Sequence, residues 1–163
     1  MTKSVQPLTL LTLGWSDGYS FDPVGFNLLS SAKRSNRCQE ISDKIDHRTN
    51  GYKARKESMP AKPDAAILLI QRALAAGIQA DYVLMDTWFT TEPMLAKILG
   101  TGIDAIGMVK QLKQRYNYQG RAYTLPELRR YVRFDGSKNI FGSIIVTTKT
   151  GIPVKIVIIR QPQ

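Results

Sequence analysis

The segment Ala80-Asp81-Tyr82-Val83-Leu84-Met85-Asp86 constrains the fold more than any other part of this 163-residue chain. Its four consecutive apolar residues lack the alternation of a strand with one face in water. They predict a strand buried on both faces of a parallel sheet. Such a strand presents the side chain at its carboxyl end to the crevice where α/β proteins bind ligands. Asp86 is therefore a candidate ligand for a hard metal ion, and an ordinary Asp in a turn is the alternative.

Helical patterns lie on both sides of this strand. A helix is expected from residue 63 to residue 77, where glycine ends it. A second helix is capped by Thr91 and stops at Gly100. Residues 103–109 then follow as another buried strand. Helix, strand, helix and strand at this spacing predict an α/β fold with helices flanking the sheet.

Hairpins are expected near both ends of the chain. Residues 8–15 form a strand, the Asp17-Gly18 turn follows, and an extended stretch runs over residues 19–21 until Pro23 ends it. Asp17 is a rival candidate acid, although the turn is sufficient to explain it. A second hairpin, rich in β-branched residues, pairs residues 143–148 with 152–159.

The formal net charge of +10 favours a polyanionic partner, most often nucleic acid. Residues 30–62 are rich in lysine and arginine and poor in apolar residues, apart from a hint of a short helix at Ile41 and Ile45. This segment is expected to be a basic excursion over the surface, in which Lys53, Arg55 and Lys56 contact phosphates. A solvated loop on a merely soluble basic protein is the alternative.

A second basic segment interleaves cations with aromatic residues, which suits phosphate contacts and base stacking. Its cations are Lys110, Lys113, Arg115 and Arg121, and its aromatic residues are Tyr116, Tyr118 and Tyr123. A lid loop whose tyrosines pack on the sheet is the alternative. The pattern from Thr124 to Glu127 is a capping box, which predicts a short helix through Tyr131 that carries several arginines.

Composition argues against several other classes of protein. The single cysteine, Cys38, cannot form an internal disulfide, and no Cys/His pair has zinc-site spacing. His47, the only histidine, lies in a charged stretch and is expected to be a solvated surface residue. No apolar stretch reaches 18 residues, and the beginning of the sequence lacks the features of a signal peptide. We therefore expect a cytoplasmic protein that does not enter a membrane.

Three stretches resemble the DDE transposases of bacterial insertion sequences, in the insertion-sequence-four family. They are residues 11–21 (LTLGWSDGYSF), residues 80–89 (ADYVLMDTWF) and residues 106–110 (IGMVK). The resemblance implies a ribonuclease-H-like core over residues 1–106 and a β-rich insertion over residues 107–163. It also implies that Asp86 is the second acid of the metal-binding triad, with Mg²⁺ or Mn²⁺ as cofactor. The implied partner is DNA at the transposon ends, and no small-molecule substrate is expected.

The sequence also departs from the family pattern. The family's first acid lies on a strand before residue 8 and its third acid on a helix after the insertion, so we expect one partial catalytic domain, truncated at both ends. Two-metal chemistry needs several carboxylates, so the chain is expected to be inactive alone. Glu57, Glu92 and Glu127 are possible substitutes, but Glu92 suits a helix dipole and Glu127 a capping box.

Two other functions remain open from the sequence. One is a non-catalytic nucleic-acid-binding module, which needs no acids, and the other is a hydrolase built on Asp17 and Asp86. An incomplete sheet also has open edges and an uncovered apolar face, which predicts self-association.

Overall fold

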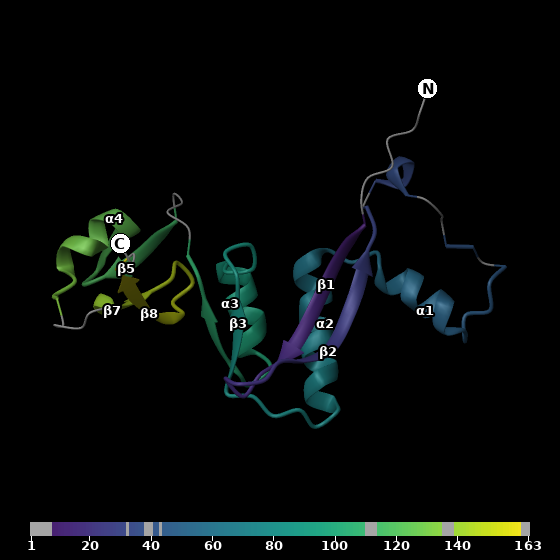
Figure 1. Ribbon diagram of the computed structural model, residues 1–163. Helices are drawn as coiled ribbons and strands as arrows, with labels where there is room; N and C mark the ends of the chain where they lie inside the picture. The colour runs from purple at the N-terminus through teal and green to yellow at the C-terminus, as the bar shows by residue number, and fades with distance from the viewer. Residues whose placement is uncertain are drawn as a thin grey trace. The chain divides into compact units, whose positions relative to one another are not determined.

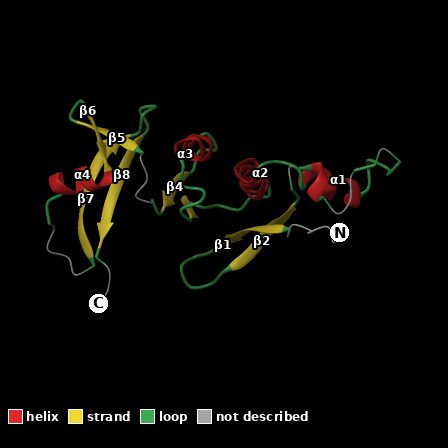
Figure 2. Ribbon diagram, turned by 90° about the horizontal axis from the view of Figure 1, so that it is seen from above, coloured by secondary structure: helices red, strands yellow, loops and turns green. Residues whose placement is uncertain are grey.

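The computed structural model describes residues 8–31, 33–37, 41–42, 44–109, 114–134 and 139–160, and it has the mixed α/β character expected from the sequence (Figures 1 and 2). Packing divides the chain into two compact units. Unit 1 comprises residues 1–83 and 97–104, and unit 2 comprises residues 84–96 and 105–163. Among the described residues, no helix is both long and apolar enough to cross a membrane.

Unit 1 contains an antiparallel hairpin backed by a helix. Strands β1 (Thr9–Trp15) and β2 (Asp22–Leu29) pair along their length, and helix α2 (Lys62–Ala75) packs on one face of the hairpin (Figure 1). The apolar residues buried here are Leu29, Ala65, Leu69, Ile70 and Ala73. Asn27 on β2 is also buried, and its side-chain amide donates to the Glu57 carbonyl at 2.8 Å. The opposite face of the hairpin exposes Leu10, Phe26 and Leu28.

The expectation that Pro23 ends the first hairpin is wrong. Residues 19–21 belong to the loop, and β2 begins at Asp22 and continues through Pro23. Pro23 pairs with Gly14 where the register shifts between Leu13 and Gly14. Proline lacks a backbone N–H, and it is tolerated in a strand at such an irregularity or at an unpaired edge.

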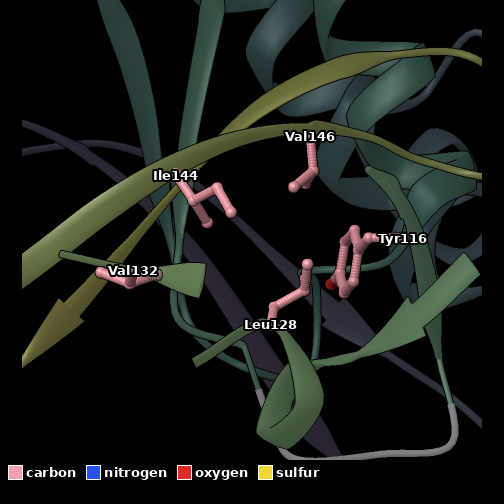
Figure 3. Close-up of a cluster of buried hydrophobic side chains, with 5 residues drawn as sticks. All are labelled: Tyr116, Leu128, Val132, Ile144 and Val146. Carbon is pink, nitrogen blue, oxygen red and sulfur yellow. The ribbon is translucent and has the colours of Figure 1, made fainter. Parts of the chain in front are cut away.

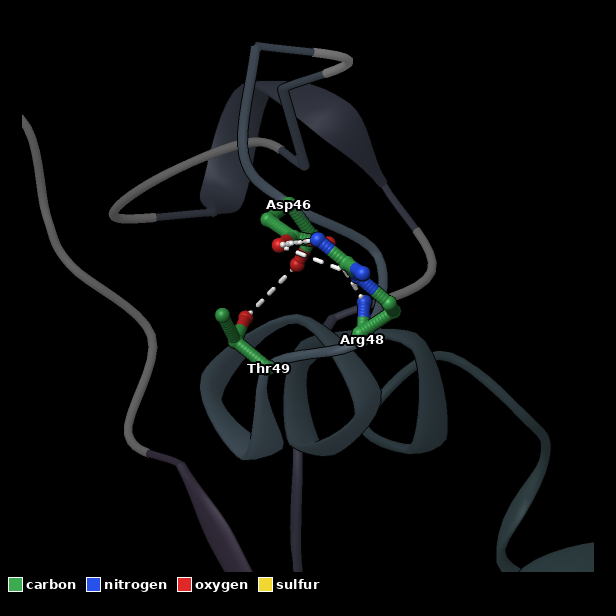
Figure 4. Close-up of polar contacts among 3 residues, drawn as sticks. All are labelled: Asp46, Arg48 and Thr49. Atoms are coloured by element: carbon green, nitrogen blue, oxygen red, sulfur yellow. Dashed lines mark hydrogen bonds and ion pairs between the residues drawn. The ribbon is translucent and has the colours of Figure 1, made fainter.

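The basic segment of unit 1 contains a helix that composition did not reveal. Helix α1 (Asn50–Glu57) begins after Thr49, whose hydroxyl accepts the Tyr52 N–H at 3.3 Å. The Thr49 hydroxyl also donates to the Asp46 carbonyl, and the Arg48 side chain bonds to the Asp46 carboxylate (Figure 4). These local bonds form the turn that precedes α1 and cap its first turn. They start the helix although its own sequence is polar.

The hint of a helix at Ile41 and Ile45 is wrong, because the described residues there form a coil and a turn. Among the described residues between β2 and α1, the only helical element is the 3-10 turn η1 (Arg34–Asn36).

Strand β3 (Tyr82–Met85) pairs with β4 (Asp104–Gly107), and α3 (Glu92–Leu99) connects them. The Asp104 N–H donates to the Asp81 carbonyl at 3.3 Å and the Met108 N–H to the Met85 carbonyl at 3.4 Å. Both bonds advance in the same direction along the two segments, which is the pattern of a parallel pair. The parallel pairing agrees with the sequence expectation.

The expected burial of β3 on both faces is wrong. Val83 and Met85 are half-buried, whereas Tyr82 and Leu84 are 49% and 70% exposed. The sheet has two strands, and the described residues place no second layer over the face that carries Tyr82 and Leu84. The apolar run of residues 82–85 therefore belongs to a strand that is covered on one face, not to a central strand that is buried on both.

Unit 2 is dominated by a four-stranded antiparallel sheet in the order β6-β5-β7-β8. The strands are β5 (Arg115–Tyr118), β6 (Arg121–Thr124), β7 (Ile140–Thr147) and β8 (Pro153–Ile159). A short helix, α4 (Leu125–Leu128), continues into the 3-10 turn η2 (Arg129–Tyr131). The core, shown in Figure 3, consists of Tyr116, Leu128, Val132, Ile144 and Val146.

Local sequence signals predicted much of unit 2. The β7–β8 hairpin is confirmed, and so is the capping box, in which the Thr124 N–H donates to the Glu127 carboxylate at 2.7 Å. The β5–β6 hairpin was missed. Its turn residues, Gln119 and Gly120, both have positive φ (48° and 77°), and Gln-Gly lacks the Asn-Gly signature of such turns.

Candidate nucleic-acid interface and the strand-end carboxylate

Asp86 lies directly after β3, where the sequence placed it. Its carboxylate accepts the Trp88 N–H at 2.9 Å, and its carbonyl accepts the Thr90 hydroxyl at 2.7 Å. The carbonyl also accepts the backbone N–H groups of Phe89 and Thr90. These bonds are those of an Asp that stabilises a tight turn after a strand, so the turn alone accounts for the residue type.

The donor set around Asp86 does not fit a two-metal centre. One carboxylate oxygen is already a hydrogen-bond acceptor for Trp88. Within the described ranges, no group of three or more His, Cys, Asp or Glu side chains could hold a metal ion. A single, partly engaged carboxylate cannot position two Mg²⁺ or Mn²⁺ ions, which need several oxygen ligands. No catalytic step through a metal follows from these residues.

The other candidate acids also have local structural roles. Asp17 accepts the N–H groups of Tyr19 and Ser20 at 2.9 and 2.7 Å in the hairpin loop, and these bonds from Ser20 and Tyr19 lower its pKa. Glu57 forms a bidentate ion pair with Arg72, and the hydrogen bonds from Arg72 lower the pKa of Glu57. Each carboxylate therefore stays ionised while it stabilises its own unit.

Two acids of unit 2 are likewise engaged. Glu127 accepts the N–H and hydroxyl of Thr124, and these bonds lower its pKa. Glu92, in the first turn of α3, accepts the N–H and hydroxyl of Thr150, both at 2.6 Å. Hydrogen bonds from the Thr148 and Thr150 hydroxyls and the Thr150 N–H lower the pKa of Glu92. None of these contacts brings two carboxylates together.

The first group of expected phosphate contacts lies on α1. Lys53 and Lys56 are exposed and, three residues apart, lie on the same side of the helix. The positive charge of Lys53 also contributes to the lowered pKa of Glu57, after the hydrogen bond from Arg72. Arg55 is half-buried and is engaged in an interaction of its own. Lys53 and Lys56 therefore remain the accessible cations of this group.

The second group does not form one surface. Arg115 pairs with Thr124 and Arg121 with Tyr118 in the β5–β6 register. Because successive side chains alternate between faces, Arg121 lies on the face of Tyr116 and Tyr118, whereas Arg115 lies on the opposite face. Lys110 and Lys113 lie outside the described residues.

The tyrosines of this segment pack against the protein. Tyr116 is buried in the core, and burial raises the pKa of its phenol. Tyr118 and Tyr123 pack against the same core, and the ring of Tyr131 lies 5.6 and 5.1 Å from their respective ring centroids. Packing on the sheet, the alternative left open by the sequence, therefore describes Tyr116, Tyr118 and Tyr123 better than base stacking does.

An arginine and phenylalanine cluster at the other end of the sheet was missed. The Arg129 guanidinium lies 5.6 Å from the centroid of the Phe141 ring, and the Arg160 guanidinium lies 4.4 Å from that of Phe134. The two rings are 6.1 Å apart. The arginines of the 124–131 helix were visible in the sequence, but no local pattern linked them to Phe134, Phe141 and Arg160.

Comparisons of the chain with protein-family models, with curated proteins and with solved structures find no match.

Proposed function

We propose that this chain is part of a DDE transposase of the insertion-sequence-four family, and that its described residues bind DNA through the phosphates. One observation in unit 2 supports the binding most directly. The three described acids there, Asp86, Glu92 and Glu127, are each held by hydrogen bonds from neighbouring groups. The described cations of that unit outnumber them: Arg115, Arg121, Arg129, Arg130, Arg133, Lys149, Lys155 and Arg160. Such an excess attracts a polyanion.

The family assignment rests on the quoted motifs and on the parallel β3–β4 pair, in which Asp86 directly follows β3. We propose a ribonuclease-H-like fold for the segment up to residue 106 and a β-rich insertion after it. Asp86 then takes the position of the second triad acid, and Mg²⁺ or Mn²⁺ is the ion that it helps to hold in an intact active site. A DNA-binding role also implies a cytoplasmic location with the bacterial DNA.

A second candidate is a non-catalytic nucleic-acid-binding module without transposase ancestry. The observation in its favour is the Trp88 N–H bond to Asp86, because a turn-forming Asp needs no metal. Both candidates predict salt-sensitive DNA binding. They differ in whether Asp86 contributes to any metal-dependent property.

Salt-dependent binding is the first test. A fluorescein-labelled duplex is titrated with the full chain between about 50 and 200 mM salt, and affinity is followed by anisotropy. We expect the logarithm of the association constant to fall linearly, with a slope of about −0.9 for each phosphate neutralised. The double variant Lys53→Gln/Lys56→Gln should reduce this slope. Lys97→Gln is the matched control, since Lys97 already pairs with Asp64. An affinity that does not change with salt would contradict the proposed contacts to the DNA phosphates.

The role of Asp86 is tested by metal-dependent cleavage. We expect no nicking or joining of supercoiled DNA by the chain alone with Mg²⁺ or Mn²⁺, because one carboxylate cannot position two ions. Asp86→Asn is compared with Asp17→Asn, a turn-forming acid of unit 1. If the wild type nicks DNA and only Asp86→Asn loses that activity, the chain is catalytic by itself. If Mn²⁺ tightens DNA binding in wild type but not in Asp86→Asn, the transposase assignment is favoured over the simple module.

A further inference from the structure

Arg129, Phe141, Phe134 and Arg160 form a continuous row of neighbouring side chains in unit 2, in which the two phenylalanine rings are tilted by 48°. We name this row the arginine–phenylalanine stack. The Arg129 guanidinium lies over the Phe141 ring, Phe141 lies beside Phe134, and the Arg160 guanidinium lies over the Phe134 ring. Phe134 remains 53% exposed, and both arginines are exposed. The four side chains come from η2, from the segment after it, from β7 and from the residue that directly follows β8.

Backbone packing determines where the stack forms. A Cβ atom on Gly142 would lie 2.2 Å from the Arg133 carbonyl oxygen and 2.7 Å from Val132 Cγ1. Only glycine therefore lets the 132–133 segment lie directly against β7. The β7–β8 register shifts between Ile140 and Gly142, at the position of Phe141. These two features bring Phe134 next to Phe141, which lies 6.1 Å away.

The end of β8 brings Arg160 to the same place. The Arg160 N–H donates to the Asn139 carbonyl at 2.9 Å, which continues the pairing of the two strands past Ile140 and Ile159. This backbone bond holds the Arg160 residue at the end of the sheet, and the ring of Phe134 holds its guanidinium. Ordering the side chain in advance reduces the entropy lost when it binds a ligand.

No described carboxylate forms an ion pair with either guanidinium. The Glu92 carboxylate bonds to Thr150, beyond the opposite end of the β7–β8 hairpin. At about 3.4 Å per residue, the strand from Ile140 to Thr147 separates the two ends by roughly 24 Å. That distance exceeds the screening length at physiological salt, about 8 Å, so Glu92 does not neutralise the stack.

We propose that the arginine–phenylalanine stack is a phosphate-binding site for DNA, with Arg129 and Arg160 as its two contacts. The guanidinium carbons of Arg129 and Arg160 lie 5.6 and 4.4 Å from the centroids of their rings. A cation–π contact does not use the guanidinium N–H groups as hydrogen-bond donors, so these groups can donate to phosphate oxygens. The site takes the DNA backbone rather than a base edge. This inference rests on the proposed DNA binding and names the residues of unit 2 that carry it.

The alternative is that the stack only closes the end of the hydrophobic core. In that case the arginines cover the rings of Phe134 and Phe141. Replacing the arginines then changes the stability of the protein, and the fraction that remains folded binds DNA with unchanged affinity. The two roles are separable because binding and unfolding are measured independently.

The test measures DNA affinity against salt concentration for Arg129→Gln, Arg160→Gln and the double variant of the full chain. We expect each single variant to lower affinity about tenfold and to reduce the salt slope by about 0.9, and the double variant to reduce it by about twice that. Lys155→Gln is the matched control, because Lys155 is an exposed cation on β8 that lies over no described ring. Thermal unfolding identifies any variant that fails to fold.

A further variant keeps both charges and removes the ring. Phe134→Leu should weaken affinity several-fold, because Arg160 loses the surface that orients it. If Phe134→Leu and the arginine variants fold and bind like wild type, the stack is not a binding site, although DNA binding elsewhere stands. If Lys155→Gln loses as much affinity as Arg160→Gln, the effect is one of net charge and the assignment to the stack is wrong. If the wild type shows no salt-dependent binding, the proposed function itself fails.

Discussion

The carboxylate of Glu92 accepts two hydrogen bonds from Thr150, a residue 58 positions later in the chain. Glu92 begins α3, and Thr150 lies in the turn between β7 and β8. The two hydrogen bonds therefore connect the first turn of α3 to the β7–β8 hairpin within unit 2. Glu92 was a possible substitute for a missing catalytic acid in the sequence. In the structure its carboxylate forms a tertiary contact instead.

We predict that Glu92→Gln destabilises the protein by about 1 kcal/mol at neutral pH, because a hydrogen-bonded charge is replaced by a weaker acceptor. The lowered pKa of Glu92 means that this stabilisation is present above the ordinary glutamate pKa. It is lost as the pH falls through the lowered value. Thermal unfolding of both proteins from neutral pH to about pH 2.5 should show the deficit shrink with acidification.

Thr150→Val is the matched control for Glu92→Gln, since it removes the hydroxyl but keeps the N–H donor. It should show a smaller deficit with the same dependence on pH. A Glu92→Gln deficit that persists unchanged in acid would mean that the ionised carboxylate is not its cause.

We predict that Gly142→Ala destabilises unit 2 by about 2 kcal/mol or more, because the new Cβ atom would collide with the Arg133 carbonyl oxygen. Chemical denaturation is the measurement. Ser143→Ala, at the exposed neighbouring position on β7, is the control and should change stability by less than about 0.5 kcal/mol. Equal stabilities for the two variants would contradict the close packing of the 132–133 segment against β7.

We predict that Gln119→Asn stabilises the protein by about 0.5 kcal/mol. Gln119 has a φ of 48°, which asparagine adopts more readily, and Asn-Gly is the preferred sequence of a two-residue hairpin turn. Gly120→Ala should have the opposite effect, since Gly120 has a φ of 77°. Denaturation midpoints that move the same way for both variants would argue against this turn.

We predict that the chain self-associates and that Phe26→Ser weakens this association. Phe26 is 72% exposed on the face of the β1–β2 hairpin that α2 does not cover, beside Leu10 and Leu28. Sedimentation velocity over a range of concentrations measures the effect. Ile145→Ser is the control, because Ile145 is similarly exposed, at 69%, but lies in unit 2. A monomer at every concentration would contradict the prediction.

Much of the local structure was predictable because its signals lie within a few residues of one another. The capping box joins Thr124 to Glu127, three residues apart, and the β7–β8 hairpin follows from two β-branched runs around one turn. The α2 helix and the position of Asp86 at the end of β3 followed from apolar patterning and strand length. Helix α1 was missed because its polar sequence has no apolar periodicity, and its start depends on the turn at Asp46.

The sequence by itself therefore determined the α/β character, most strands and helices, and the basic charge. Only the tertiary structure decided which cations share a surface. It placed Arg115 and Arg121 on opposite faces of one hairpin and brought Arg160 onto the ring of Phe134. Strand register, a bulge and one close approach at Gly142 produce these neighbours. The contact of Arg160 with Phe134 joins separate elements of the chain, and the faces of Arg115 and Arg121 depend on strand register, so no local pattern encodes them.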